Sequence, residues 1–333
     1  MKLEQMPRYP LLCGFTPLQR MENLEQALGC GPLYIKRDAL TPLGLGGNKT
    51  RKLEFLLGDA LAGGAATLVT VGGVQPNHGR LPAAAAAKAG LACTLVLDGA
   101  RPEKLSGNLL LDCLLGASLV YTDGRSTSAV IEETLAALQA AGRAPYFIPE
   151  GGSNAVGSAG YLAMVPELLA QADSLPVPPA RLVCTMGSLG TFAGLWLGAR
   201  AFGAPFSVTG VAVNPTTGYT REKAAALVNE MSAAYGLDIA AAPEDMDIIY
   251  ADAAHDYAGP GYNVPDAKTR GAVELLARTE GIFLDPCYTA KSFRGFCDIA
   301  RELDGGAIFV HTGGTPALWT QEHLDAFAAD YCN

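Results

Sequence analysis

The stretch Gly46-Gly47-Asn48-Lys49-Thr50-Arg51-Lys52-Leu53-Glu54 leads from a glycine pair directly into a helix-prone segment. Leu53, Leu57 and Leu61 recur at helical spacing, so we expect Lys49 to lie where the loop becomes the helix. The first turn of a helix has free N–H groups and a positive dipole end, which attract phosphate and disfavour a charged amine. This position predicts a lowered pKa for Lys49, and such a lysine can form a Schiff base with a carbonyl group. An ordinary solvated lysine on a capping turn is the simpler alternative.

The composition is that of a well-buried globular enzyme rather than a disordered chain. Of the 333 residues, 49% are hydrophobic and 17% are charged. The net charge of -9 and the lack of a basic run argue against nucleic acid or an anionic membrane as a partner. No apolar run reaches membrane-spanning length, and the N-terminal segment is too short and too polar for a signal peptide. We therefore expect a cytoplasmic protein.

The cysteines give no metal or disulfide signature. They form no CxxC pair and have no histidine neighbours at metal-binding spacing, so we expect neither a structural metal nor a disulfide framework. The eight cysteines are Cys13, Cys30, Cys93, Cys113, Cys184, Cys287, Cys297 and Cys332.

Apolar β-prone runs alternate with helix-prone segments along the chain. This rhythm predicts an α/β fold with largely parallel sheets, in which loops at the carboxyl ends of the strands bind ligands. Five such loops are rich in glycine or polar residues. The strand candidates are 33–36, 66–71, 91–97, 146–148, 181–185, 207–213 and 307–311; helix candidates include 81–89, 109–115, 128–141, 157–169, 221–235 and a helix from 192.

The turn Gly187-Ser188-Leu189-Gly190-Thr191 joins a strand candidate to a helix candidate. Its N–H groups, its two hydroxyls and the helix N-terminus could hold one phosphate. It is not a Walker loop, and the chain has no convincing GxGxxG fingerprint, so a nicotinamide-linked oxidoreductase is disfavoured. A tight strand-to-helix turn is the simpler alternative.

Other candidate groups lie on three polar segments. The loop 75–80 contains Asn77, which could bond a cofactor oxygen, and His78, which could transfer a proton, orient another group or simply pack. Tyr262 lies in the turn 259–265, and Tyr288 lies in 285–291. Each tyrosine could tune a proton or hold a carboxylate, or could be a half-buried anchor.

Five segments occur in the order seen in one enzyme family. The chain resembles the D-cysteine desulfhydrase and 1-aminocyclopropane-1-carboxylate deaminase family of pyridoxal-phosphate enzymes over nearly its whole length. The segments are GGNKTRKLE (46–54), GGVQ with Asn77-His78, GPGYNVP (259–265), EGIFLDPCYTAK (280–291) and HTGGTPAL (311–318).

The resemblance implies a two-lobed, tryptophan-synthase-β-like fold and a homodimer. Residues 1–50 and 161–333 would form the large cofactor-binding lobe, and 51–160 a small inserted α/β lobe. It also implies that Lys49 forms the Schiff base, that Asn77 bonds the ring hydroxyl and that Thr289 or Thr312 faces the ring nitrogen. The remaining implied site residues are Gly187, Ser188, Leu189, Gly190 and Thr191 for the phosphate, Tyr262 and Tyr288 as catalytic groups flanking the substrate, and Gln75, Pro76, Asn77 and His78 for substrate binding.

Two positions depart from relatives within the family. Thr289 stands where the deaminase branch has glutamate, and a hydroxyl at the ring nitrogen gives a weaker electron sink, which favours β-elimination over ring opening. Pro76 replaces a family serine and has neither a hydroxyl nor an N–H.

The resemblance thus implies β-elimination from a three-carbon amino acid, with D-cysteine giving pyruvate, ammonia and sulfide. The alternatives are a cysteate sulfo-lyase that releases sulfite, a 1-aminocyclopropane-1-carboxylate deaminase, and a pyridoxal-phosphate-binding protein without turnover.

Overall fold

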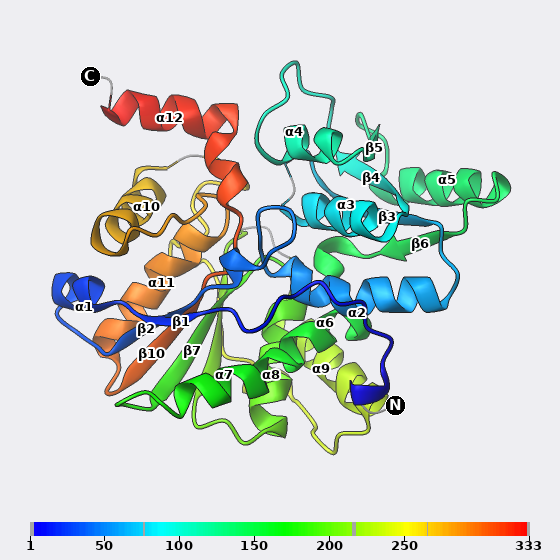
Figure 1. Ribbon diagram of the computed structural model, residues 1–333. Coiled ribbons are helices and arrows are strands. Elements are labelled where there is room, and N and C mark those ends of the chain that lie inside the picture. The colour runs from blue at the N-terminus through cyan, green and yellow to red at the C-terminus, as the bar shows by residue number, and fades with distance from the viewer. Residues whose placement is uncertain (1–2, 76, 215–217, 265, 332–333) are drawn as a thin grey trace.

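The computed structural model describes residues 3–75, 77–214, 218–264 and 266–331, and their strands form two sheets (Figure 1). The larger sheet has the order β1-β2-β10-β7-β8-β9, and the smaller has the order β5-β4-β3-β6. Every pairing except that of β1 with β2 is parallel, which confirms the predicted α/β class. The strands are β1 (Leu18–Arg20), β2 (Leu33–Lys36), β3 (Thr67–Gly73), β4 (Ala92–Asp98), β5 (Ser118–Tyr121), β6 (Pro145–Ile148), β7 (Pro179–Met186), β8 (Ser207–Ala212), β9 (Ile248–Ile249) and β10 (Gly306–Val310).

The helices cover both faces of the large sheet and pack around the small one (Figure 1). They are α1 (Glu22–Leu28), α2 (Lys49–Ala62), α3 (Asn77–Ala89), α4 (Gly107–Leu114), α5 (Thr127–Ala140), α6 (Ala155–Leu162), α7 (Met164–Ala172), α8 (Gly190–Ala201), α9 (Arg221–Tyr235), α10 (Ala267–Glu280), α11 (Thr289–Glu302) and α12 (Gln321–Tyr331). Short 3-10 turns occur at η1 (Leu3–Gln5), η2 (Asp38–Leu40), η3 (Glu150–Gly152), η4 (Pro243–Asp245) and η5 (Thr315–Trp319).

The large sheet is buried on both faces because its strands carry apolar side chains at consecutive positions. Ile308 and Val310 of β10 pack toward α8 and α9, whereas Ala307 and Phe309 pack toward α10 and α11. This near-continuous apolar pattern is typical of parallel strands covered by helices on each side.

The small sheet has its own core, which it shares with α2, α3 and α4. All its strands come from residues 67–148, inside the segment expected to form the small lobe. The division into 1–50 with 161–333 and 51–160 stays a prediction about the lobe boundaries.

Several predicted boundaries were wrong. Helix α3 begins at Asn77 rather than at residue 81, so the polar residues 77–80 form its first turn and not a loop. The helix expected over 157–169 is divided into α6 and α7. Polar first turns and short breaks are poorly marked by hydrophobic spacing, which explains both errors.

Helix α2 lies on α6, and α6 lies on α8, at a separation that only glycine permits. A Cβ on Gly160 would lie 2.2 Å from the carbonyl oxygen of Arg51, and a Cβ on Gly194 would lie 2.4 Å from that of Ser158. These contacts fix α2 against α6, and α6 against α8, by main-chain packing.

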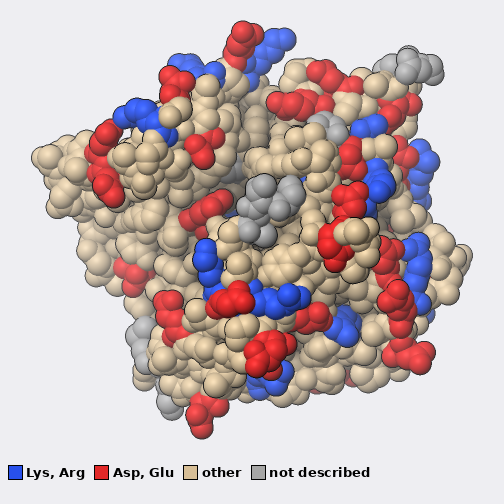
Figure 2. Space-filling model, turned by 180° about the vertical axis from the view of Figure 1, so that it is seen from behind, with Lys and Arg blue, Asp and Glu red and all other residues tan. Residues whose placement is uncertain are grey.

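The surface carries charges of both signs. On the face in Figure 2, Lys and Arg side chains are interspersed with Asp and Glu side chains rather than gathered into one basic area. Among the described residues, no helix is both long enough and apolar enough to cross a membrane.

Candidate active site

The carboxyl ends of five strands and the start of α2 surround a cavity of about 190 Å³. This is the edge at which the sequence predicted ligand binding. The lining residues are Asn48, Lys49, Gly72, Gly73, Asn77, His78, Glu150, Gly151, Thr185, Gly187, Ser188, Thr191, Asn214, Tyr262, Tyr288 and Thr312.

Lys49 is the first residue of α2 and lines this cavity, as the sequence predicted. Its Nζ donates to Oδ1 of Asn48 at 3.2 Å. Burial lowers the pKa of Lys49 to about 8, and the carboxylate of Glu150 opposes this shift. The predicted lowering is therefore confirmed, with burial as its main cause, and an appreciable share of the amine is neutral near pH 7.

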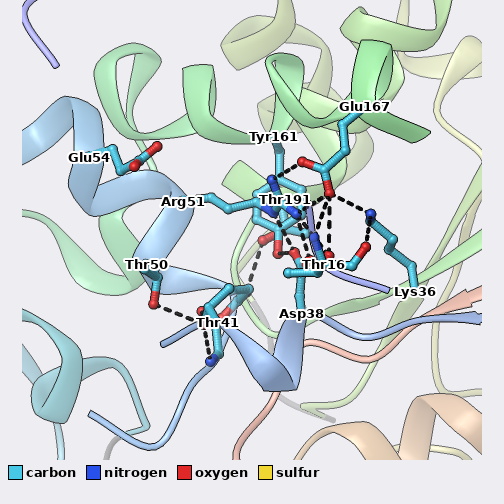
Figure 3. Close-up of polar contacts among 12 residues, drawn as sticks. Thr16, Lys36, Asp38, Thr41, Thr50, Arg51, Glu54, Tyr161, Glu167 and Thr191 are labelled. Carbon is cyan, nitrogen blue, oxygen red and sulfur yellow. Dashed lines mark hydrogen bonds and ion pairs between the residues drawn. The ribbon is translucent and has the colours of Figure 1, made fainter. Parts of the chain in front are cut away.

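A buried network of charges anchors α2 behind the cavity (Figure 3). Arg51 donates to Asp38 at 2.8 and 2.9 Å and to Glu167 at 2.8 and 2.9 Å. Tyr161 donates to Asp38 at 2.6 Å, and Lys36 donates to Glu167. Because Arg51 lies two residues after Lys49, the network fixes the end of α2 that carries Lys49.

The segment 187–191 forms the turn into α8, as predicted. Gly187, Ser188 and Thr191 line the cavity, whereas Leu189 and Gly190 support the turn from behind. The backbone N–H of Gly190 donates to Oγ of Ser153 at 3.1 Å. Two cavity hydroxyls at the N-terminus of a 12-residue helix form a favourable site for an anion.

Lys52 and Ser153 also belong to this region, and sequence reasoning did not single them out. Nζ of Lys52 donates to the carbonyl of Gly151 at 2.9 Å and to Oγ of Ser153 at 3.3 Å. A Cβ on Gly190 would lie 2.7 Å from Nζ of Lys52. The available signal was the i, i+3 spacing of Lys49 and Lys52, which places both lysines on neighbouring positions of one helix face.

Asn77 and His78 face the cavity from the first turn of α3. Oδ1 of Asn77 is buried and has no hydrogen-bond partner among the described residues. A buried acceptor without a donor is costly, so this atom is suited to a ligand that supplies a hydrogen.

The hydrogen bonds of His78 define its role. Oγ1 of Thr70 donates its hydrogen to the carbonyl of Ile148 at 2.8 Å, so it accepts from Nε2 of His78, which lies 2.7 Å away. Burial, with Lys49 and Lys52 nearby, holds the pKa of His78 well below its ordinary value. His78 is therefore a neutral imidazole with an acceptor at Nδ1.

The predicted substrate loop is only partly brought to the cavity. The side chain of Gln75 turns toward α4, where Oε1 accepts from the N–H of Leu109 at 3.3 Å and Nε2 donates to the carbonyl of Ser106 at 3.1 Å. Gln75 is not among the lining residues, and Pro76 lies outside the described residues.

Tyr262 and Tyr288 form an edge-on pair at the cavity, with ring centroids 5.8 Å apart and planes at 67°. The hydroxyl of Tyr262 donates to the carbonyl of Gln75 at 3.2 Å, so the hydroxyl of Tyr288 is the donor to Tyr262 at 3.1 Å. Burial and the neighbouring Tyr262 raise the pKa of Tyr288 well above its ordinary value. Tyr288 thus stays protonated, and its remaining lone pairs can accept a hydrogen bond from a ligand.

The two threonines considered for the ring nitrogen are placed differently. Thr289 is fully buried, and its hydroxyl donates to Oδ2 of Asp285 at 2.5 Å, away from the lining residues. Thr312 lines the cavity. The geometry therefore favours Thr312 over Thr289 for contact with a ligand.

Several lining residues were not predicted as site residues. Glu150 and Gly151 follow β6, Thr185 is the next-to-last residue of β7, and Asn214 follows β8. The signal that could have found them is their place just beyond strand candidates, since the same rule located the segments after β3 and β7.

The family model described as pyridoxal-phosphate dependent enzyme matches residues 10–313, which is most of the chain. The chain belongs to this family. Among relatives of this pyridoxal-phosphate-dependent enzyme, the D-cysteine desulfhydrase of Yersinia enterocolitica is 40% identical over 328 residues, 96% of this chain and 97% of the relative. A putative 1-aminocyclopropane-1-carboxylate deaminase of Pyrococcus abyssi is 38% identical over 322 residues, 95% of this chain and 94% of the relative.

Solved structures share the fold of this pyridoxal-phosphate-dependent enzyme. The crystal structure of an ACC deaminase homologue has a TM-score of 0.88 at 35% identity and covers 98% of this chain and 97% of its own. A fungal L-serine ammonia-lyase from Rhizomucor miehei has a TM-score of 0.66 at 19% identity, covers 96% and 98% of the two chains, and supports the fold alone. The predicted two-lobed pyridoxal-phosphate fold is thereby confirmed.

The cavity residues fit pyridoxal phosphate. The enzyme offers a half-buried amine at Lys49, hydroxyls at a helix N-terminus for a phosphate, and a buried acceptor at Asn77 that has no partner among the described residues. A Cβ on Gly187 would make a tight contact of 3.2 Å with the ring of Tyr288, which glycine avoids. These groups match the aldehyde, the phosphate and the ring hydroxyl of the cofactor in chemical type.

Proposed function

We propose that this enzyme eliminates sulfide from D-cysteine, giving pyruvate, ammonia and hydrogen sulfide with the uptake of one water. The observation that carries the proposal is the half-buried, partly neutral amine of Lys49 in one cavity with the Tyr262–Tyr288 pair. The 40% identity to a D-cysteine desulfhydrase over nearly the full length of both chains supports this substrate.

Four residues would hold the cofactor. Lys49 would hold its carbonyl carbon, Asn77 its ring hydroxyl, and Ser188 with Thr191 its phosphate. When bound, pyridoxal phosphate withdraws the electron pair that remains after the α proton is lost.

Lys49 would also provide the base, once the substrate's amino group has replaced it at that carbonyl carbon and freed its amine. With a pKa of about 8, its amine can accept the α proton of the substrate near neutral pH and return a proton later. The buried network around Arg51 holds the end of α2 in place, so Nζ of Lys49 keeps its position. Positioning of this kind accounts for much of the rate enhancement in reactions of bound groups.

The tyrosine pair binds the other end of the substrate in this proposal. Tyr288 uses its hydrogen on Tyr262, so its oxygen accepts from a thiol or an ammonium group of the substrate. Tyr262, which is 36% exposed, lies toward the solvent side and covers the substrate.

Elimination is preferred here to opening of a cyclopropane ring. The ring nitrogen would meet the hydroxyl of Thr312, because the hydroxyl of Thr289 is engaged by Asp285. A hydroxyl keeps this nitrogen less protonated than a carboxylate would, which suits a substrate whose β substituent leaves readily. The relative described as a putative 1-aminocyclopropane-1-carboxylate deaminase makes ring opening the second candidate.

The test is keto-acid release by the cofactor-loaded enzyme with D-cysteine, L-cysteine, D-cysteate, L-cysteate and 1-aminocyclopropane-1-carboxylate. We expect pyruvate and sulfide in equal amounts from D-cysteine at the highest kcat/KM. If sulfite is released from cysteate at a higher kcat/KM than sulfide from D-cysteine, the leaving group is sulfite and not sulfide. Formation of 2-oxobutyrate from the cyclopropane would replace the reaction itself, and no product from any compound would favour a binding protein.

We also propose that the enzyme acts in the cytoplasm as a homodimer. The motif resemblance is the support for this assignment. Sedimentation of the cofactor-loaded protein tests the dimer, and fractionation of cells that produce it tests the location. A monomer at micromolar concentration, or recovery outside the cytoplasm, would contradict it.

A further inference from the structure

Glu150 is an acidic side chain in a cavity that must accept an amino acid. It lies in η3, just after β6, and its exposed side chain is one of those that line the cavity. Of the described lining residues, Glu150 is the one with a carboxylate, and Lys49 is the one with an amine. The neutral His78 and the protonated tyrosines add no further charge.

A tyrosine holds the Glu150 carboxylate in its place. The hydroxyl of Tyr219 donates to Oε2 of Glu150 at 2.8 Å. Burial, followed by the charge of Glu150, raises the pKa of Tyr219, so this tyrosine remains a donor at neutral pH. The carboxylate also interacts electrostatically with Lys49, because its charge opposes the lowering of the pKa of Lys49.

The charge balance of the cavity changes when the cofactor is held. A phosphate would then lie at Ser188 and Thr191. Glu150 and this phosphate are both negative, so an additional negative group on the substrate side chain meets repulsion. A thiol is neutral at pH 7 and can donate to an acceptor, whereas a sulfonate is always anionic.

We propose that Glu150 is a specificity-determining residue that selects amino acids with a neutral β substituent and rejects those with an anionic one. This inference rests on the proposed function, since it assigns the side-chain preference of that same elimination. Rejection by like charge requires no direct contact with the leaving group, and it is a common way to exclude a close analogue.

The test compares Glu150→Gln with wild type on two substrates. We expect the ratio of kcat/KM for D-cysteine to that for D-cysteate to fall about fivefold in the variant, which corresponds to about 1 kcal/mol, the size of one charge pair in a partly hydrated site. The control is Glu132→Gln on α5, an exposed residue that lies away from the cavity and changes the net charge equally. Its ratio should equal that of wild type.

A binding measurement separates charge from turnover. D-asparagine and D-aspartate have the same shape and differ by one charge, and neither carries a sulfur leaving group. Calorimetric titration of the cofactor-loaded enzyme should show tighter binding of D-asparagine than of D-aspartate, with the difference reduced about fivefold in Glu150→Gln. Tyr219→Phe, which releases the carboxylate, should reduce it by a smaller factor.

Wild type alone provides a test should Glu150→Gln not fold. Raising the NaCl concentration from about 0.05 M to about 0.5 M shortens the screening length. It should therefore lower the ratio of kcat/KM for D-cysteine to that for D-cysteate. Equal substrate ratios and equal binding differences in wild type and Glu150→Gln, with D-cysteine turned over, would overturn the inference and leave the proposed function standing. Failure of wild type to release sulfide from D-cysteine would instead overturn the proposed function.

Discussion

Replacement of Arg51 by methionine should destabilise the protein strongly, because it removes a guanidinium from between two buried carboxylates. The side chain of Arg51 is 3% exposed, and those of Asp38 and Glu167 are 0% and 7% exposed. Removing one partner of a buried ion pair leaves an uncompensated charge and costs about 3–5 kcal/mol. Lys36 still neutralises Glu167, so we expect the free energy of unfolding to fall by about 3–5 kcal/mol near pH 7.5 rather than by twice that amount.

This loss should depend on pH. Burial by itself raises the pKa of Asp38, but the charge and hydrogen bonds of Arg51 outweigh it, so the net pKa is lowered. A carboxyl group with a lowered folded pKa contributes stability above its unfolded pKa, and that contribution is lost as the pH falls through the folded pKa. In Arg51→Met burial dominates and raises the pKa of Asp38. Protonation of Asp38 at low pH therefore removes the buried charge that destabilises the variant. The stability difference should therefore be smaller near pH 5 than near pH 7.5.

Urea unfolding of the cofactor-loaded protein, followed by far-UV circular dichroism at both pH values, measures the difference. The matched control is Arg125→Met, which breaks the surface ion pair with Glu133. The side chain of Arg125 is 53% exposed, and that of Glu133 is 64% exposed. That variant should lose at most about 1 kcal/mol. If Arg51→Met lowers the free energy of unfolding by less than about 1 kcal/mol, or by equal amounts at both pH values, the ion pairs of Arg51 do not stabilise the protein. Packing alone would then hold α2.

Three further predictions concern the cavity. The rate constant for capture of pyridoxal phosphate by the apoprotein should rise about tenfold per pH unit below pH 8 and level off above it, because only the neutral amine of Lys49 reacts. Stopped-flow absorbance measures this rate constant, and a value that does not change with pH would contradict the prediction. Tyr288→Phe should lower kcat/KM by about 10–100-fold by removing an acceptor for the substrate, and unchanged steady-state kinetics would exclude that role. Gly190→Ala places a Cβ 2.7 Å from Nζ of Lys52, so the Kd for the cofactor in equilibrium dialysis should rise at least about tenfold with unchanged circular dichroism. An unaltered Kd would show that the turn 187–191 can shift to make room for the added Cβ.

The sequence predicted those features that depend on local pattern. The glycine pair and the leucine spacing placed Lys49 at the start of α2, and the strand periodicity placed Gly187–Thr191 at the entrance to α8. Both predictions needed only residues within a few positions of each other. The lowered pKa of Lys49 was also expected, although its main cause is burial, which no local pattern reveals.

The features that were missed depend on contacts between distant segments. Arg51 and Glu167 are 116 residues apart, and Glu150 meets Tyr219 across 69 residues. Nothing within a short window marks either pair. The orientation of Gln75 toward α4 was missed for the same reason, because its partners come from the segment 106–109.

In the proposed reaction Lys49 holds the cofactor in this cavity, and Lys52, one helical turn away, is the alternative amine. Lys52 is fully buried and bonded to Gly151, whereas Lys49 lines the cavity. Borohydride reduction of the loaded enzyme, followed by peptide mass spectrometry, identifies the modified lysine. We expect the pyridoxyl label on Lys49 and a loss of D-cysteine turnover in proportion to labelling. A label on Lys52, or full labelling with activity retained, would contradict it.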